Sequence, residues 1–415
     1  MSPQKRILVL YADAGFGHRS AANALIEALE EMYGDQIQID MVNPLEDRRA
    51  PSILRDSQSD YDKMVRSTPE LYKLGFQASD QMVTSTLFES ALTVMLFEVM
   101  RDVVRRYDPE VIATTYPLYQ APLEAVFAIS RRYVPVITIV TDLATVHRIW
   151  FNNSVDLCLV PTARVRELAM EAGLKPRQLQ ITGIPVHPKL SNETRSAVTI
   201  REELGWRKDL VTVLVVGSRR VYNLPEVLRA LNHSGLPIQL VVVAGGDDEL
   251  YGQFEETKWH APTQVYNFVR NMPDLMHASD LVVCKAGGLI VTESLACGLP
   301  MILVDVIPGQ ETGNADYVVG GGAGEMGESP IEVLEVLYHW LQFGGELLAR
   351  RAQNARQLGR PHAAYAVAEI VWSTAKPERA ERQHRRILGR PKLLDLLRSN
   401  HIPVKETEAV ENSES

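Results

Sequence analysis

The chain has 415 residues, of which 46% are hydrophobic and 23% are charged, and its formal net charge is −9 at pH 7. This composition is typical of a globular protein, and the length suits two domains better than one hydrophobic core. The net charge argues against an electrostatic affinity for nucleic acid over the whole surface, because nucleic-acid-binding proteins need a basic surface.

The first half of the chain alternates short apolar runs with helical patterns, as parallel α/β units do. A doubly wound α/β domain over residues 1–190 accounts for this alternation. The expected elements are strands at 5–11, 37–41, 111–114, 136–141, 157–160 and 179–182, with helices at 18–32, 118–132 and 162–171.

The loop after the first strand carries two glycines, Gly15 and Gly17, directly before His18. The glycines let the backbone turn tightly beside a ligand, and we expect a helix to begin at the histidine. The dipole of that helix lowers the proton affinity of the imidazole, which can then act as a neutral base. The alternative is a histidine that only caps the helix or lies on the surface.

A long insertion, residues 45–107, reads as helical and lies between the second and third strands. Its apolar residues belong to the core or, alternatively, to a surface that meets a membrane. Glu89 and Glu98 interrupt its longest apolar helix, residues 82–100, so we expect no bare membrane span there. The candidates for a membrane-facing surface are Tyr61, Tyr72, Leu74, Phe76, Leu87, Phe88 and Phe97.

A second polar cluster, Asp142, His147 and Trp150, follows the strand at 136–141. These side chains either serve a reaction or have structural roles, Asp142 as a helix cap and the two rings in packing.

The chain then becomes polar at residues 188–200, where we place the interdomain linker. Strands at 210–216, 238–243, 265–268, 281–284 and 301–304 predict a second α/β domain over residues 200–375.

Residues 283–314 carry the strongest signal in the chain. The run predicts a strand, a Gly287-Gly288 turn, a helix carrying Glu293, another strand, and a turn with Gln310, Glu311 and Asn314. Bare backbone N–H groups at a helix N-terminus are suited to a phosphate group. The alternative is an ordinary strand-turn-helix without a ligand.

This run resembles the donor-site signature of the GT-B glycosyltransferases that make glycolipids from UDP-sugars. These are the monogalactosyldiacylglycerol synthases and the processive diacylglycerol glucosyltransferases. The resemblance implies two Rossmann-like domains facing a cleft, with the glycines on the pyrophosphate, Glu293 on the uridine ribose, and the Gln-Glu pair with Asn314 on the sugar. The UDP-sugar ligands that it implies are Gly17, Gly217, Ser218, Phe268, Val269, Lys285, Gly287, Gly288, Glu293, Gln310, Glu311 and Asn314.

The same resemblance implies an inverting hexosyltransferase that uses UDP-galactose or UDP-glucose and diacylglycerol. His18 is its expected base or sugar ligand, Asp142 and His147 are the rival bases, and Trp150 lies toward the acceptor. The spacing from Asp142 to Trp150 resembles the plant galactolipid synthases more than the bacterial glucosyltransferases, which favours galactose. Residues 217–222 depart from the family's glycine-rich loop, which leaves donor choice open.

Three alternatives remain at this stage: an N-acetylglucosaminyltransferase acting on a lipid-linked cell-wall precursor, a UDP-sugar epimerase, and a relative that binds without turnover. We expect no metal cofactor, because Asp247 and Asp248 lie at a glycine turn without further ligands at a suitable spacing. Cys158, Cys284 and Cys297 lie in apolar segments and predict reduced thiols and a cytoplasmic location.

The C-terminal tail, residues 376–415, is basic first and acidic at its end. Its Arg and Lys residues either contact anionic headgroups at the inner face of the cell membrane or belong to a solvated helix packed across the first domain. The first apolar run, residues 7–10, is too short for a signal-peptide core.

Overall fold

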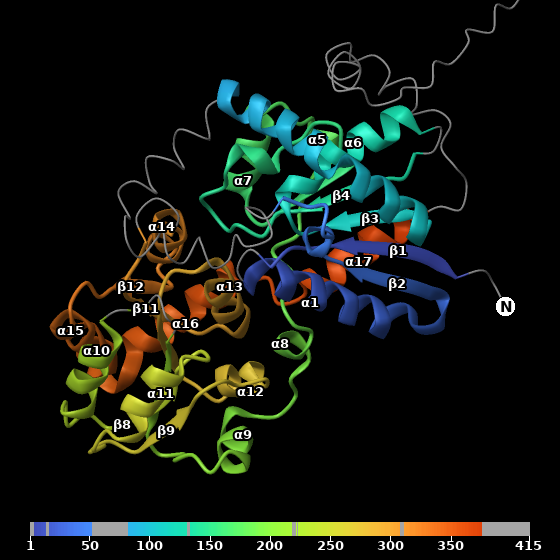
Figure 1. Cartoon of the computed structure of the whole chain (residues 1–415). Coiled ribbons are helices and arrows are strands. Elements are labelled where there is room, and N and C mark those ends of the chain that lie inside the picture. Colours follow the sequence, from blue (N-terminus) through green and yellow to red (C-terminus); the bar gives the residue numbers. More distant parts are fainter. Residues whose placement is uncertain are drawn as a thin grey trace, which may run out of the picture.

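The computed structural model describes residues 4–13, 16–51, 82–130, 133–217, 221, 223–307 and 311–375. These residues form two α/β domains, each built on a six-stranded parallel sheet (Figure 1). Parallel sheets need helices on both faces, which explains why the strands read as continuous apolar runs.

The first sheet has the strand order β2-β1-β3-β4-β5-β6, and all of its neighbouring strands pair in parallel. Its strand order reverses direction between β1 and β3, and such a switch point is where ligands of open α/β sheets collect. The strands are β1 (Lys5–Leu10), β2 (Ile37–Val42), β3 (Val111–Thr114), β4 (Val136–Ile139), β5 (Leu157–Val160) and β6 (Leu179–Ile181).

Alternate residues of β1 enter two different cores, as the two-residue period of a strand requires. Leu8 and Leu10 pack toward α5, α6 and α7, whereas Ile7 and Val9 pack toward α1 and α17. These helices are α1 (Phe16–Tyr33), α5 (Met82–Tyr107), α6 (Gln120–Ile129), α7 (Ala163–Glu171) and α17 (Ala363–Thr374).

The second sheet has the order β12-β11-β10-β7-β8-β9, with its switch point between β7 and β10. Its strands are β7 (Val211–Val216), β8 (Ile238–Val243), β9 (Thr263–Tyr266), β10 (Leu281–Cys284), β11 (Met301–Leu303) and β12 (Gly324–Met326). Its helices are α10 (Leu224–Asn232), α11 (Asp248–Glu255), α12 (Met272–His277), α13 (Gly288–Cys297), α14 (Thr312–Gly320), α15 (Pro330–Leu341) and α16 (Glu346–Leu358).

The polar segment between the domains contains two short helices, α8 (Lys189–Asn192) and α9 (Ala197–Glu203). Leu190 and Ile200 are buried in the core of the second domain. The buried Arg201 side chain forms an ion pair with Asp280 at 2.8 Å. The predicted linker is therefore packed against the second domain.

Helix α17 belongs to the first domain in space, although our sequence-based range of 200–375 places it in the second. Figure 1 shows it, in red-orange, among the blue and teal elements around β1 and β3. The chain crosses between the domains near Gly183 and returns near Arg360. A Cβ atom built on Gly183, whose φ is +86°, would lie 2.7 Å from Cβ of Arg360, so the two crossings are in contact.

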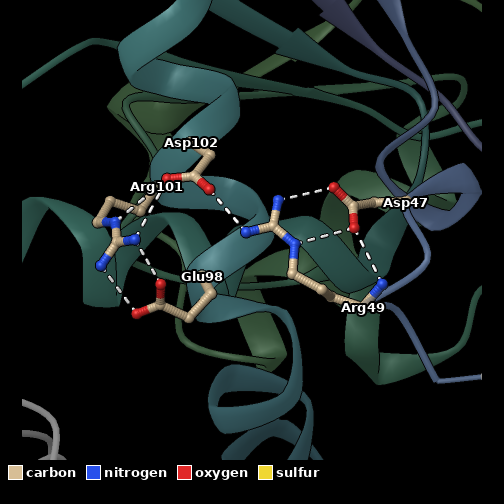
Figure 2. A network of polar contacts seen from close by, with 5 residues as sticks. All are labelled: Asp47, Arg49, Glu98, Arg101 and Asp102. Carbon is tan, nitrogen blue, oxygen red and sulfur yellow. Dashed lines mark hydrogen bonds and ion pairs between the residues drawn. The ribbon is translucent and has the colours of Figure 1, made fainter.

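An ion-pair network joins the chain just before residue 52 to helix α5, which begins at Met82 (Figure 2). Arg49 contacts Asp47 at 2.7 Å and Asp102 at 2.6 Å, and Arg101 connects Asp102 with Glu98. Hydrogen bonding to Arg49 lowers the pKa of Asp47 to about 2. Exposed ion pairs contribute little to stability, so the network mainly fixes the two ends of the insertion relative to each other.

All predicted strands are present; four have the predicted bounds, and the ends of the others differ by one or two residues. The short strand β12 was not predicted. Phe97, a candidate for the membrane-facing surface, is only 3% exposed and packs in the core of the first domain, so the core alternative holds for this residue. Side chains of residues 82–92, and the whole of residues 52–81 with the other aromatic candidates, lie outside the described residues. Within the described part of the chain, no helix is both long and apolar enough to cross a membrane.

Candidate active site

The site on the first domain surrounds His18, in the first turn of α1. Its Nδ1 lies 2.8 Å from Oγ1 of Thr141, the second residue after β4. Tyr116 meets the imidazole edge-on at 5.1 Å between ring centroids, and Trp150 lies 5.8 Å away. The hydroxyl of Thr115 donates to the backbone oxygen of His18 at 2.9 Å. Residues that follow β3 and β4 thus fix the ring from several sides.

Burial lowers the pKa of His18 to about 4, and a hydrogen bond with the Thr115 backbone acts in the opposite direction. The imidazole is therefore neutral at pH 7. The sequence predicted this neutral state but attributed it to the helix dipole, whereas desolvation is the main cause. The helix also begins earlier than predicted, at Phe16.

Asp142 is tied to Trp150, the neighbour of the His18 ring, by a hydrogen bond across the loop. The indole N–H of Trp150 donates to Oδ2 of Asp142 at 2.6 Å, and the indole is almost completely buried. Burial raises the pKa of Asp142 to about 6, although the hydrogen bond from Trp150 lowers it. A carboxyl group with such a pKa can exchange a proton near neutral pH.

We expect the substitution Asp142→Asn to stabilise the protein above pH 6. The folded state raises this pKa from 3.8, so charging Asp142 costs stability as the pH rises from about 4 to about 6. That difference corresponds to about 3 kcal/mol at pH 8. Urea denaturation of both proteins between pH 4 and pH 8 measures the gain.

Asp47→Asn is the control with the opposite sign, because the pKa of Asp47 is lowered and its charged form favours the folded state. It should cost stability at pH 8. A gain in Asp142→Asn that does not change with pH would contradict the assignment.

His147 has a capping role in the structure. Its Nδ1 accepts a hydrogen bond from the backbone N–H of Ile149 at 3.1 Å. The imidazole therefore caps the short helix η4 (Arg148–Trp150). This structural role weakens the case for His147 as the base.

On the second domain, Gly287 and Gly288 begin α13 after β10, as predicted. Lys285 and Glu311 form a buried ion pair beside this turn, with side chains 18% and 4% exposed. The other carboxylate oxygen of Glu311 accepts from the backbone N–H of Ile307 at 3.2 Å. A cation and two glycine N–H groups therefore lie at one helix N-terminus.

Asn314 is aimed at the same turn. Its Nδ2 donates to the backbone oxygen of Ala286 at 3.0 Å, while its buried Oδ1 has no hydrogen-bond partner in the described structure. Buried polar atoms are normally paired, so this oxygen is a candidate acceptor for a ligand hydroxyl. A Cβ atom on Gly288 would lie 3.9 Å from Nδ2 of Asn314.

The remaining predicted ligands that the structure describes lie on several other segments, apart from Glu293 on α13 itself. Burial raises the pKa of Glu293, on α13, to about 7. Gly217 follows β7, the neighbour of β10, and donates to the backbone oxygen of Val243 at 2.7 Å. Phe268 is 66% exposed, and Val269 packs against the core. Gly17 lies within α1, next to His18.

Two predicted ligands, Ser218 and Gln310, lie outside the described residues. The Asp247 and Asp248 pair has structural partners: Asp247 caps α11 by accepting from Leu250 N–H at 3.2 Å, and Asp248 accepts from Asn267 at 2.6 Å. Sequence reasoning missed Thr141 and Thr145. Threonine after a strand is common, and its only signal here was adjacency to Asp142.

The two groups of residues meet at the domain junction. The backbone oxygen of Thr141 would lie 3.5 Å from a Cβ atom on Gly288. The hydroxyl of Thr145 accepts a hydrogen bond from the backbone N–H of Gly313 at 3.1 Å. The loop after β4 therefore contacts both the start of α13 and the start of α14.

Residues 18–186 match the family described as "Monogalactosyldiacylglycerol (MGDG) synthase", and residues 212–358 match the "Glycosyltransferase family 28 C-terminal domain". The chain is 32% identical over 377 residues to a probable monogalactosyldiacylglycerol synthase 2, chloroplastic, from Oryza sativa subsp. japonica. That alignment covers 88% of this chain and 80% of the rice protein.

Two solved structures share the fold. MurG of Acinetobacter baumannii has a TM-score of 0.57 at 15% identity, over 89% of this chain and 100% of that one. The UDP-GlcNAc 2-epimerase from Neisseria meningitidis, bound to UDP-GlcNAc, has a TM-score of 0.57 at 12% identity, over 88% and 99%. With the sequence matches, this fold shows that the chain is a hexosyltransferase of GT-B architecture that belongs to the monogalactosyldiacylglycerol synthase family.

Proposed function

We propose that the protein transfers galactose from UDP-galactose to diacylglycerol with inversion at the anomeric carbon. The proposal rests on one observation. A neutral, partly buried His18 lies at a domain junction whose other side is a helix N-terminus with Lys285, Glu311 and Asn314. The named activity of the rice relative supports galactose and diacylglycerol as substrates. The UDP-GlcNAc bound to the epimerase of the same fold supports a UDP-sugar donor.

In the proposed reaction, His18 takes the proton from the free hydroxyl of diacylglycerol. The hydroxyl oxygen then forms a bond to the anomeric carbon while the bond from that carbon to the diphosphate oxygen breaks. UDP leaves from the opposite face of the sugar. Asp142 stays hydrogen-bonded to Trp150, whose ring lies 5.8 Å from the imidazole.

The leaving diphosphate is stabilised by the N–H groups at the start of α13 and by the Lys285 ammonium. We propose that these protein groups balance the diphosphate charge. Among the residues described, no group of three or more His, Cys, Asp or Glu side chains is arranged to hold a metal ion. The diphosphate charge also favours protonation of His18 when the donor is bound, because a nearby anion raises an imidazole pKa.

The acceptor is a membrane lipid, so the proposal includes peripheral contact with a membrane. The candidate segments for that contact, residues 52–81 and the basic tail after residue 375, lie outside the described residues. We propose that vesicles containing anionic lipid bind the protein better than neutral vesicles do, since the tail carries clustered Arg and Lys.

The test is incubation with radiolabelled UDP-galactose or UDP-glucose and diacylglycerol in anionic vesicles. We expect a labelled monogalactosyl lipid of β configuration by NMR and a lower rate with UDP-glucose. A faster reaction with UDP-glucose would overturn the donor assignment. Conversion of UDP-GlcNAc without glycolipid, or binding of UDP without any product, would overturn the proposed reaction.

A further inference from the structure

The first turn of α14 has a backbone N–H donor that finds no acceptor within its own helix. In the first turn of a helix, backbone N–H groups lack partners within the helix. The Gly313 N–H is one of them, and it donates at 3.1 Å to the hydroxyl of Thr145, which lies on the other domain and 168 residues earlier in the chain. A side chain of the first domain therefore caps a helix of the second.

This contact lies between the two halves of the candidate active site. On one side, Thr145 is three residues from Asp142, which binds Trp150 beside His18. On the other side, Gly313 lies between Glu311, which pairs with Lys285, and Asn314. Any change in the distance between Thr145 and Gly313 must also shift the carboxylate and amide relative to the imidazole.

The contact leaves no space for a side chain at residue 313. A Cβ atom built on Gly313 would lie 2.0 Å from Oγ1, 3.1 Å from the backbone nitrogen and 3.2 Å from Cβ of Thr145. Gly320, at the other end of the same helix, has no atom within 4 Å of its Cβ position. Residue 313 must therefore be glycine because Thr145 of the opposite domain occupies the space that a side chain would need.

We propose that Thr145 is a positioning residue, whose hydroxyl caps α14 from the first domain and sets the distance between the donor-sugar ligands and the base. The inference rests on the proposed function, because it assigns Glu311 and Asn314 to the sugar. It adds that the domain arrangement seen here is the one in which transfer takes place.

Gly313→Ala is expected to lower kcat by about 10-fold or more. Alanine is itself better than glycine inside a helix, so helix stability does not explain a loss. The Kd of UDP, measured by calorimetry, should change less than about threefold, since the proposed UDP ligands lie at α13. Gly320→Ala is the matched control and should keep normal activity. Equal activity of the two alanine variants would overturn the inference.

The second arm removes the other partner of the contact. Thr145→Ala should lower kcat, and Thr145→Ser should recover most of that loss because it keeps the hydroxyl. Combining Thr145→Ala with Gly313→Ala removes the 2.0 Å contact, so the double variant should be more active than Gly313→Ala alone. If the fold-losses in kcat of the two single variants multiply in the double variant, the inference is contradicted.

A third arm does not depend on activity. The Cβ separation of 3.2 Å between residue 145 and a side chain at 313 is close to the range of about 3.5–4.5 Å found in disulfides. We expect Thr145→Cys with Gly313→Cys to form a disulfide on oxidation, detected by mass spectrometry after thiol alkylation. Thr145→Cys with Gly320→Cys is the control that should stay reduced. Failure of the first pair to cross-link would overturn the inference, whereas a cross-linked protein without UDP binding would instead disprove the proposed function.

Discussion

His18→Asn is expected to lower kcat by about 10²–10⁴, the usual contribution of one general base. Asparagine can keep a hydrogen bond to Thr141 but has no nitrogen that can accept the proton of the acceptor hydroxyl. The Kd of UDP should stay within a few-fold of the original, because the proposed UDP ligands lie at α13. Steady-state kinetics with diacylglycerol vesicles and calorimetry with UDP measure the two effects separately.

The control for this substitution is His233→Asn, because His233 is exposed at the end of α10. Its imidazole contacts only the Arg229 carbonyl and the His260 ring among the described interactions. It should leave kcat unchanged. Near-normal turnover of His18→Asn would assign His18 to ligand binding and move the base to Asp142. A rate that falls while the Kd of UDP rises by the same factor would also contradict the base assignment.

Glu311→Leu is expected to lower the free energy of unfolding by about 3 kcal/mol, because it leaves the partly buried Lys285 ammonium without its carboxylate partner. It also removes the acceptor of the Ile307 N–H. Activity should disappear, since the substitution deletes a proposed sugar ligand. Urea denaturation followed by circular dichroism measures the stability, and the transfer assay measures the activity.

The double variant Lys285→Met with Glu311→Leu separates these two roles. A buried ion pair that is replaced as a whole by apolar residues of similar volume costs little, so most of the stability should return. The activity should not return. Glu335→Leu, an exposed position on α15, is the control and should change neither property. Recovery of transfer in the double variant would exclude Glu311 as a sugar ligand.

Much of the fold could be predicted from local patterns. Strands β3, β4 and β10 are buried on both faces, so each reads as an apolar run bounded by turn residues. Strand β12 has three residues and begins with a glycine, which gives no comparable pattern. The place of Phe97 stayed open because a helical apolar period shows that a face is buried without showing whether protein or lipid covers it.

The site residues that lie in loops directly after strands could be predicted from the sequence. His18, Asp142 and Lys285 come after β1, β4 and β10, and parallel strands bring such residues to one edge of a sheet. Two features depended on distant parts of the chain. The main cause of the low His18 pKa is burial by Tyr116, Trp150 and the other packed loops. The contact of Thr145 with Gly313 joins residues of different domains, and neither residue type indicates the other.

The return of α17 to the first domain has a consequence for how the protein is made. Ala364, Val367, Ala368 and Val371 complete the core against α1 and the first sheet, yet they come after the whole second domain in the sequence. During synthesis, the N-terminal half leaves the ribosome with this apolar face uncovered, and the second domain can fold before the face is closed. Native folding of the N-terminal domain is therefore completed only after translation has passed residue 371, so a chain that stops earlier exposes a surface prone to aggregation.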